Sequence, residues 1–267
     1  MPDKTRHRLG GILLALGLAA WMFILILTAL HAVGTDDGLY HREQMAANVL
    51  PLAGISGDDL RALDAAMAAY LAGDPSKLAP DGETALTMTV LGAQQPAFNE
   101  KEMTHMADCA ALFALLRKVR RRLVAWAVLL SVLGARLLFD RRRVRRVAWL
   151  SPLVLLIPLG GFALWAAADF DAAFTFFHKM LFTNDLWLLD PRTDLLIRVC
   201  PERMFMHMGA RIGLWSLGAL VAVPLVVTIL TIIWPKGRKE EANTWNDRDM
   251  RRASGQKQIV FGKTGMR

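Results

Sequence analysis

The sequence predicts an all-α polytopic membrane protein with four transmembrane helices, a small extracytoplasmic helical cap and both termini in the cytoplasm. Two observations lead to this prediction. The 267 residues are 54% hydrophobic, and the apolar residues gather in blocks close to the roughly 20 residues that cross a bilayer as a helix. Lysine and arginine cluster between these blocks in the pattern expected of cytoplasmic segments.

The chain divides into nine predicted segments that follow from the apolar blocks. The first block exceeds the core of a secretory signal and no A-x-A site follows it, which favours a retained anchor over a cleaved signal. The second block is short and contains Arg136. The segments are a cytoplasmic N-terminus (1–8), the first span (9–33), a cap with an interfacial helix (34–122), the second span (123–139), a cytoplasmic loop (140–146), the third span (147–168), an aromatic-rich outer segment (169–211), the fourth span (212–234) and a disordered cytoplasmic tail (235–267).

The orientation follows from three basic groups. They lie before the first span, between the second and third spans, and after the fourth span. All three can be cytoplasmic at once if the chain has four spans and both termini lie inside. The net charge of +8 then reports topology, and binding to nucleic acid is not needed to explain it.

One basic cluster, at residues 117–122, departs from this pattern because it falls on the predicted outer side. Loop charges elsewhere could have fixed the topology first, or the number of spans could differ. The interpretation we favour is an interfacial helix whose long side chains extend toward anionic lipid head groups. We therefore predict head-group contacts for Arg117, Lys118 and Arg121.

The cap is predicted from a helix pattern over residues 56–73. Ser56 or Asp58 can cap its start, Gly73 ends it, and Leu60, Leu63, Met67 and Leu71 share one face. Residues 41–50 predict another short helix and residues 82–92 a short strand. In the second outer segment, a short interfacial helix is expected to start near Asp190–Pro191 and stop at Pro201. Such a cap is too small for a rich core of its own, so we expect it to pack on the membrane domain.

The first candidate for chemistry is the run that contains Glu102, His105 and Asp108. Residues three apart share a helix face, so both carboxylates could reach the imidazole, orient it and make it a better base. The helix would lie at the lipid surface, where a base can meet an acyl ester. The alternative is an ordinary polar helix face.

The second candidate is His178, which lies among aromatic residues at membrane depth. Ionisable groups in such places are rare and usually functional, although a histidine bonded to the backbone in an aromatic belt is the alternative. Asn184 and Trp187 follow and could donate hydrogen bonds to an oxyanion. His207 is set aside because no acid lies near it in the sequence.

Other kinds of site receive less support. A zinc site needs at least three protein ligands, and no H-E-x-x-H or paired-cysteine motif is present, so we predict neither a metal nor a cofactor. No G-x-S-x-G motif marks a serine nucleophile. Cys109 and Cys200 both fall in outer segments, where a disulfide is allowed, but we favour small apolar fillers.

Two stretches, NEKEMTHMADCAALF and FHKMLFTNDLWLLDPRTDLLIRVCPERMF, together resemble the bacterial integral membrane family that includes Lit, the lipoprotein intramolecular transacylases. The first resembles the family's E-x-x-H-M-x-D segment and the second its F-H, W-x-L and L-I-x-x-x-P-E-x-x-F segments. The resemblance covers roughly residues 9–234 in span order, and only these two stretches are specific. The chain departs from the family at Cys109, where an aliphatic residue is more usual, and in its longer basic tail.

The resemblance implies an acyltransferase of lipoprotein maturation in the bacterial plasma membrane, with its active site on the extracytoplasmic side. The substrate would be a diacylglyceryl lipoprotein, and an acyl chain would move from its sn-2 ester to the α-amine of its N-terminal cysteine, giving lyso-form lipoprotein. The family's two catalytic histidines match His105 and His178, with Glu102, Asp108, Asn184 and Trp187 in support. Membrane phospholipid is a further expected partner. The alternative is a non-catalytic protein whose cap binds lipid or a protein partner.

Overall fold

A computed structural model of the chain describes residues 3–78, 86–138 and 140–233. The predicted disordered tail, 235–267, lies outside these residues. By internal packing the chain forms two units, Met1–Val227 and Thr228–Arg267. Of the second unit only residues 228–233, the end of a long helix, are described. The architecture below is that of the first unit.

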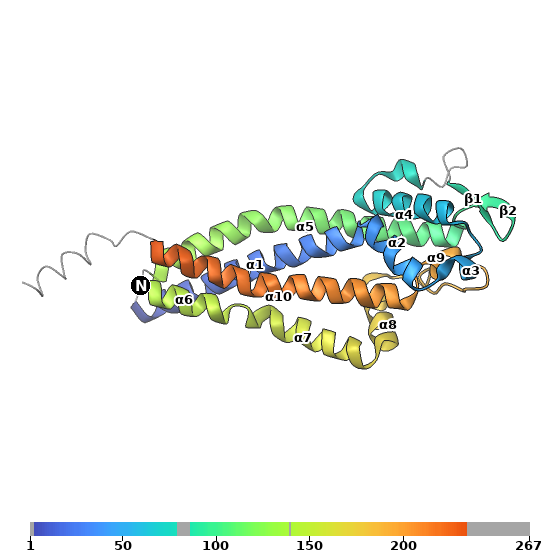
Figure 1. Ribbon diagram of the computed structural model, residues 1–267. Helices are drawn as coiled ribbons and strands as arrows, with labels where there is room; N and C mark the ends of the chain where they lie inside the picture. Colours follow the sequence, from blue (N-terminus) through green and yellow to red (C-terminus); the bar gives the residue numbers. More distant parts are fainter. Residues whose placement is uncertain (1–2, 79–85, 139, 234–267) are drawn as a thin grey trace, which may run out of the picture. The chain divides into compact units, whose positions relative to one another are not determined.

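Four helices run beside one another, and most of the other elements gather around one end of this set (Figure 1). The four are α1 (Asp3–Gly34), α5 (Glu100–Leu138), α7 (Leu153–Ala168) and α10 (Glu202–Ile233), of which residues 202–227 belong to the first unit. The short elements at that end are α2 (Asp37–Ala46), α3 (Val49–Ala53), α4 (Gly57–Ala72), the 3-10 turn η1 (Pro75–Lys77), β1 (Thr87–Val90), β2 (Ala93–Pro96), α8 (Phe170–Leu181) and α9 (Leu195–Val199). Helix α6 (Arg141–Leu150) lies near the opposite end, beside the start of α1.

Three stretches of helix are long and apolar enough to cross a membrane: α1, α6 with α7, and α10. Helix α7 has no buried residue, and Leu164 on it is 75% exposed. A helix that is apolar all round and yet uncovered by protein is typical of a membrane span. The protein is therefore a multi-pass membrane protein, while the predicted span 123–139 is outside this set.

Residues 123–138, which carry that predicted span, nevertheless pack tightly against α1 because glycines let the two backbones meet. A Cβ atom on Gly134 would lie 2.4 Å from the backbone nitrogen of Leu14, and one on Gly17 would lie 2.6 Å from that of Ser131. Small residues at such crossings are typical of helix pairs in membranes, where close van der Waals contact replaces the hydrophobic effect. The second half of α5 is thus an integral part of the helical bundle.

The predicted cap helix is confirmed as α4. The hydroxyl oxygen of Ser56 accepts a hydrogen bond from the Asp59 amide at its start, and Gly73 ends it with a φ of +110°, a conformation that favours glycine. The four residues predicted to share a face are all buried: Leu60, Leu63, Met67 and Leu71. The predicted strand is present as β1, and it pairs antiparallel with β2, which the sequence did not indicate.

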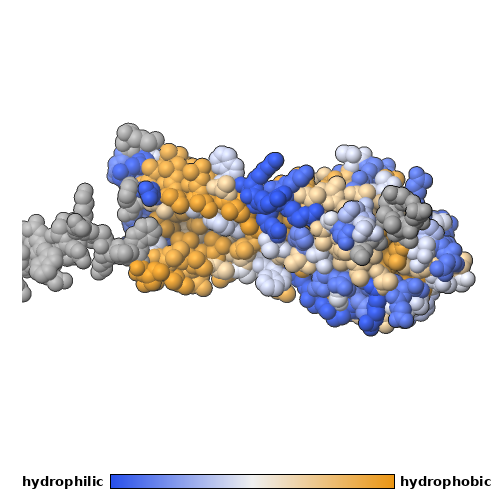
Figure 2. Space-filling model, turned by 90° about the horizontal axis from the view of Figure 1, so that it is seen from above, coloured by the Kyte–Doolittle hydropathy of each residue, from blue (hydrophilic) through white to orange (hydrophobic). Residues whose placement is uncertain are grey.

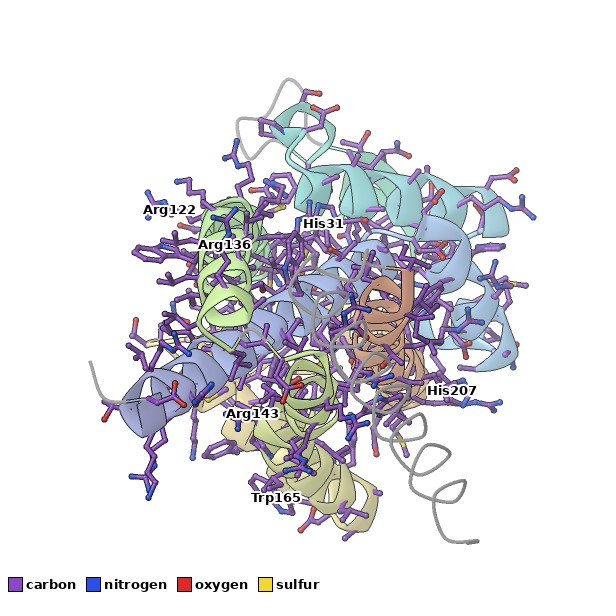
Figure 3. The ribbon with its side chains drawn as sticks, turned by 90° about the vertical axis from the view of Figure 1, so that its left-hand side faces the viewer. His31, Arg122, Arg136, Arg143, Trp165 and His207 are labelled. Atoms are coloured by element: carbon purple, nitrogen blue, oxygen red, sulfur yellow. The ribbon has the colours of Figure 1, made fainter. Side chains whose placement is uncertain are left out.

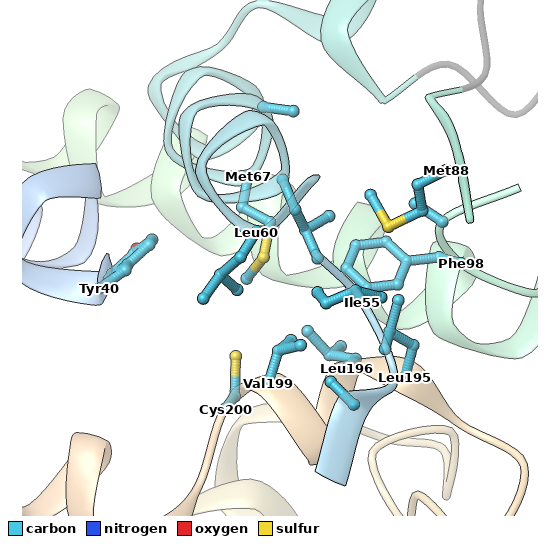
Figure 4. Packing of buried hydrophobic residues seen from close by; sticks show 14 of the residues in the cluster. Tyr40, Ile55, Leu60, Met67, Met88, Phe98, Leu195, Leu196, Val199 and Cys200 are labelled. Carbon is cyan, nitrogen blue, oxygen red and sulfur yellow. The ribbon is translucent and has the colours of Figure 1, made fainter. Parts of the chain in front are cut away.

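The hydrophobic core at this end, called the cap core below, is built from both segments that the sequence predicts to lie outside, 34–122 and 169–211 (Figure 4). Leu60 and Met88 of the first segment pack in one cluster with Leu195, Val199 and Cys200 of the second. The cap was expected to pack on the membrane domain, but its core is completed by α9 of the segment 169–211. Because α9 completes this core, the cap holds the aromatic-rich segment against the start of α5.

Three local features differ from the expectations. The interfacial helix and the second apolar block form one continuous helix, α5, of 39 residues, because arginine, lysine, leucine and alanine all favour helix. The basic segment expected as a loop is helix α6, capped by Asp140. The short helix after Pro191 is only α9, which begins after Asp194 and ends before Cys200.

Candidate active site

The structure brings His105 and His178 together although they lie on different helices. Their ring centroids are 6.3 Å apart, His105 coming from the start of α5 and His178 from the last turn of α8. The ring of Phe182 lies beside both, with centroids 5.1 Å from His105 and 5.7 Å from His178. The two candidate histidines of the sequence thus form one cluster.

His178 is held in a defined orientation. Its Nδ1 lies 2.8 Å from the carbonyl oxygen of Phe174, and since a carbonyl can only accept, Nδ1 carries the proton and Nε2 is left with its lone pair. The rings of Phe174 and Trp187 stand 4.0 and 5.0 Å from the imidazole, centroid to centroid. Burial lowers the pKa of His178, against the opposing effect of the Phe174 carbonyl. The neutral ring therefore presents Nε2 as a proton acceptor.

His105 is buried, with 8% of its surface exposed. Its Nε2 lies 3.6 Å from Sγ of Cys109, while Nδ1 has no hydrogen-bond partner within the described part of the chain. Burial and then the neighbouring His178 lower the pKa of His105 to about 4, opposed by the Asp108 charge. Both histidines are therefore neutral near pH 7.

Glu102 does not orient His105 as the sequence suggested. Its Oε2 accepts from the Asn99 amide at 2.9 Å and its Oε1 from the Leu196 amide at 2.6 Å. The amide of Glu102 in turn donates to the side-chain oxygen of Asn99, 3.0 Å away, completing a capping box at the start of α5. The carboxylate thus joins α5 to the first turn of α9, which fixes both helices around the site without touching the imidazole.

Asp108, Asn184 and Trp187 form a linked group beside the histidines. The Asn184 amide donates to Oδ2 of Asp108 at 2.9 Å, and the indole N–H of Trp187 donates to the Asn184 carbonyl at 3.0 Å. The two donors expected to serve an oxyanion are thus engaged elsewhere. Asn184 ties the segment after α8 to α5, and Trp187 donates within that segment. Asp108 acts on His105 through its charge, which raises the pKa of the imidazole.

The basic cluster divides into two parts. Arg117 donates to the Leu71 carbonyl at 3.0 Å, at the end of α4, and Arg120 donates to the hydroxyl of Thr28 on α1 at 3.4 Å. Lys118, Arg121 and Arg122 are exposed, and Arg122 projects outward from α5 in Figure 3. Figure 2 shows a hydrophilic band at this level of α5, between an apolar surface and the mixed surface of the cap.

Two side-chain contacts near the site were not predicted from the sequence: Cys109 with His105, and Glu43 with His207. Cys109 lies one turn after His105 on the same helix face, so the i+4 spacing could have identified it. His207, set aside for want of an acid, has its Nδ1 2.5 Å from Oε2 of Glu43. No local pattern could have found this partner, because Glu43 comes from α2 and the histidine from α10.

The described residues contain no group of three or more His, Cys, Asp or Glu side chains that could hold a metal ion. Cys109 and Cys200 are both free thiols. Cys200 is a buried member of the cap core, as expected of an apolar filler.

The chain matches known proteins in both sequence and fold. The family model described as lipoprotein intramolecular transacylase Lit matches residues 15–205, whereas no curated protein matches significantly. The membrane integral lipoprotein intramolecular transacylase Lit from Bacillus cereus has the same fold, with a TM-score of 0.58 at 23% identity over 84% of this chain and 95% of that one. Two structures of that protein with a histidine substitution give TM-scores of 0.56 and 0.54 at 23% and 24% identity, each over 84% of this chain and over 91% and 93% of theirs. Since the family match covers well over half of the sequence, this chain belongs to the Lit family, the lipoprotein intramolecular transacylases.

Proposed function

We propose that this chain moves an acyl chain from the sn-2 ester of a diacylglyceryl lipoprotein to the α-amine of that lipoprotein's N-terminal cysteine. The observation that carries the proposal is the pair of neutral histidines, His105 and His178, held 6.3 Å apart between ring centroids in a member of the Lit family. His178 offers a free lone pair and His105 a polar ring edge in an aromatic enclosure. These are the groups that acyl transfer from an ester to an amine requires.

In the proposed reaction His178 is the general base. The α-amine has a usual pKa of about 8, so a fraction of it is neutral near pH 7 and can attack. Its N–H becomes acidic as the nitrogen bonds to the ester carbonyl carbon, and the neutral imidazole takes that proton through Nε2. The new carbon–nitrogen bond gives a tetrahedral oxyanion, and collapse breaks the ester carbon–oxygen bond. The departing alkoxide takes the proton from His178, so the products are an amide and a free sn-2 hydroxyl.

Amine and ester belong to one molecule in this proposal, so the enzyme has to hold a single substrate folded. Holding the two groups in contact removes most of the entropy cost of bringing them together, which is a large part of the barrier for such reactions. The aromatic rings of Phe174, Phe182 and Trp187 around His178 would limit water at the ester and so favour transfer over hydrolysis. No step needs a metal or a cofactor.

We place the site on the extracytoplasmic face of the bacterial plasma membrane, with four spans and both termini inside. Two observations support this. Residues 127–138 pack along α1 through Gly17 and Gly134, and the arginines of α6 lie at the end of the bundle that holds the N-terminus. A reporter fused after residue 77 should then be active only outside the cytoplasm. Cytoplasmic activity of that fusion would contradict the topology.

Exposed basic side chains at the lipid edge support phospholipid as a second partner. We propose that Lys118 and Arg121 contact anionic head groups, since juxtamembrane basic residues are attracted to them and both side chains are exposed. Arg117 is the least suited of the three predicted contacts, because its guanidinium already donates to the Leu71 carbonyl.

The pH dependence of transfer should reflect the lowered pKa of His178, which burial moves below the usual 6.5. A base with a lowered pKa is present above that pKa and is lost only as pH falls through it. After correction for the neutral fraction of the amine, the initial rate should stay level down to about pH 6.5 and decline only at lower pH. Rates measured in vesicles between about pH 5 and pH 9 test this. A decline that begins above 6.5 would contradict it.

The direct test of the function is mass spectrometry of N-terminal lipopeptides. The chain is expressed in a bacterium that makes only diacylglyceryl lipoproteins, beside a variant with both His105→Ala and His178→Ala. We expect an acyl group on the cysteine amine with no change in total acyl mass, and none in the variant. Unchanged diacyl lipopeptides beside well-inserted protein would instead favour a cap that binds lipid or a partner without catalysis.

A further inference from the structure

Cys109 is the only polar contact of the His105 ring within the described part of the chain. Its Sγ lies 3.6 Å from Nε2, one helical turn further along α5. The other ring nitrogen, Nδ1, has no partner there, although more than nine tenths of the residue is buried. Buried polar groups are nearly always hydrogen-bonded, so this nitrogen requires an explanation.

The direction of the contact follows from the two groups. A thiol carries one proton and its sulfur is a weak acceptor, whereas an imidazole nitrogen is a good acceptor. Burial raises the pKa of Cys109 to about 12, so the group stays an S–H donor at neutral pH. Nε2 therefore accepts, and a neutral ring that accepts at Nε2 carries its proton on Nδ1.

We propose that Cys109 is a positioning residue that holds the proton of His105 on Nδ1, so that the buried Nδ1–H donates to the ester oxygen on which negative charge develops. This inference rests on the proposed acyl transfer and assigns the roles that the sequence left open. A substrate oxygen supplies the acceptor that Nδ1–H lacks in the protein alone. Because a donor gains more from an oxyanion than from a neutral carbonyl, the contact favours the transition state.

Both histidines then carry their proton on Nδ1. His178 nevertheless offers the substrate a lone pair, whereas His105 offers it an N–H donor. In His178 the Nδ1–H is engaged by the Phe174 carbonyl, which leaves a lone pair for the amine. In His105 the Nε2 lone pair is engaged by Cys109, which leaves an N–H for the oxygen. One neighbour on each helix, four residues away in both cases, is sufficient to create this difference.

The tautomer is tested by NMR of the full chain with ¹⁵N-labelled histidine in detergent micelles. The His105 signals are assigned by their loss in His105→Ala. We expect protonated Nδ1 and unprotonated Nε2 in the wild type, a shift of the proton toward Nε2 in Cys109→Val, and the wild-type pattern in Cys109→Ser, whose hydroxyl can donate. Cys200→Ala, which removes the other thiol of the cap, is the matched control and should leave the pattern unchanged. An unaltered tautomer in Cys109→Val would overturn the proposal.

The kinetic test uses the same variants. Cys109→Val should lower kcat by about tenfold to a hundredfold with little change in KM, since it misplaces one oxyanion donor, and Cys109→Ser should recover most of the loss. Equal kcat values in Cys109→Val and the wild type would also overturn the proposal. If the wild type transfers no acyl chain, the proposed function fails, whereas the NMR result still decides whether Cys109 sets the tautomer.

Discussion

Replacing His178 with alanine is expected to reduce the rate of acyl transfer by about a hundredfold to ten-thousandfold, the usual contribution of a general base. The variant loses the Nε2 lone pair that faces the site, while α8 keeps its backbone and the neighbouring Phe174 and Trp187 remain. Initial rates of N-acyl lipopeptide formation, measured by mass spectrometry with purified enzyme in vesicles, give the effect directly.

The control for this experiment is His7→Ala. His7 lies in the first turns of α1 beside Asp3, near the opposite end of the bundle, so its loss should leave the rate unchanged. Circular dichroism and the unfolding temperature of both variants should match the wild type. A His178→Ala enzyme that retains the wild-type rate would exclude this residue as the base and leave His105 as the remaining candidate.

The second large effect is expected for Glu102→Ala, as a loss of stability. Its carboxylate accepts the amides of Asn99 and Leu196, and the residue is 2% exposed. Only Leu196 is a buried residue, and leaving its amide without an acceptor should lower the free energy of unfolding by about 1–3 kcal/mol. Loss of the capping bond to the exposed Asn99 adds about 0.5–2 kcal/mol. Thermal unfolding in detergent measures this loss. The transfer rate should fall with it, because the same carboxylate joins α5 to α9.

A matched control is available two residues away, at Glu100. Glu100 is also in the first turn of α5 but is exposed, so Glu100→Ala should change the unfolding temperature little. Glu102→Gln should fall between the two, since its amide keeps one acceptor oxygen. Equal unfolding temperatures for Glu102→Ala and Glu100→Ala would contradict the capping role.

Sequence patterns predicted the parts of the fold that depend on local order. The apolar blocks identified α1, α7 and α10, and the spacing of Leu60, Leu63, Met67 and Leu71 identified the buried face of α4. These succeeded because helix periodicity and apolar length are properties of neighbouring residues. The proximity of His105 and His178 came instead from the family resemblance, since nothing local relates α5 to α8.

The predictions that failed depended on contacts between distant segments. Spacing places Glu102 and His105 on one helix face, but helical side chains lean toward the N-terminus, so the carboxylate reaches the Asn99 amide and meets Leu196 of α9. His207 was set aside for a related reason: its acidic partner, Glu43, lies on α2 and is far from it in the sequence. Strand β2 was missed because its four residues are all exposed and only the hairpin defines them.

The unbroken course of α5 has a consequence for how the enzyme responds to its surroundings. At about 1.5 Å per residue, its 39 residues form a rod nearly 60 Å long, with His105 near one end and Leu138 at the other. No loop interrupts the helix between His105 and the part that packs on α1, so we expect a change in its depth or tilt to move His105 with it. Helices adjust tilt to bilayer thickness. If α5 spans the bilayer as predicted, we expect lipid chain length to influence where His105 and His178 meet the ester of the substrate.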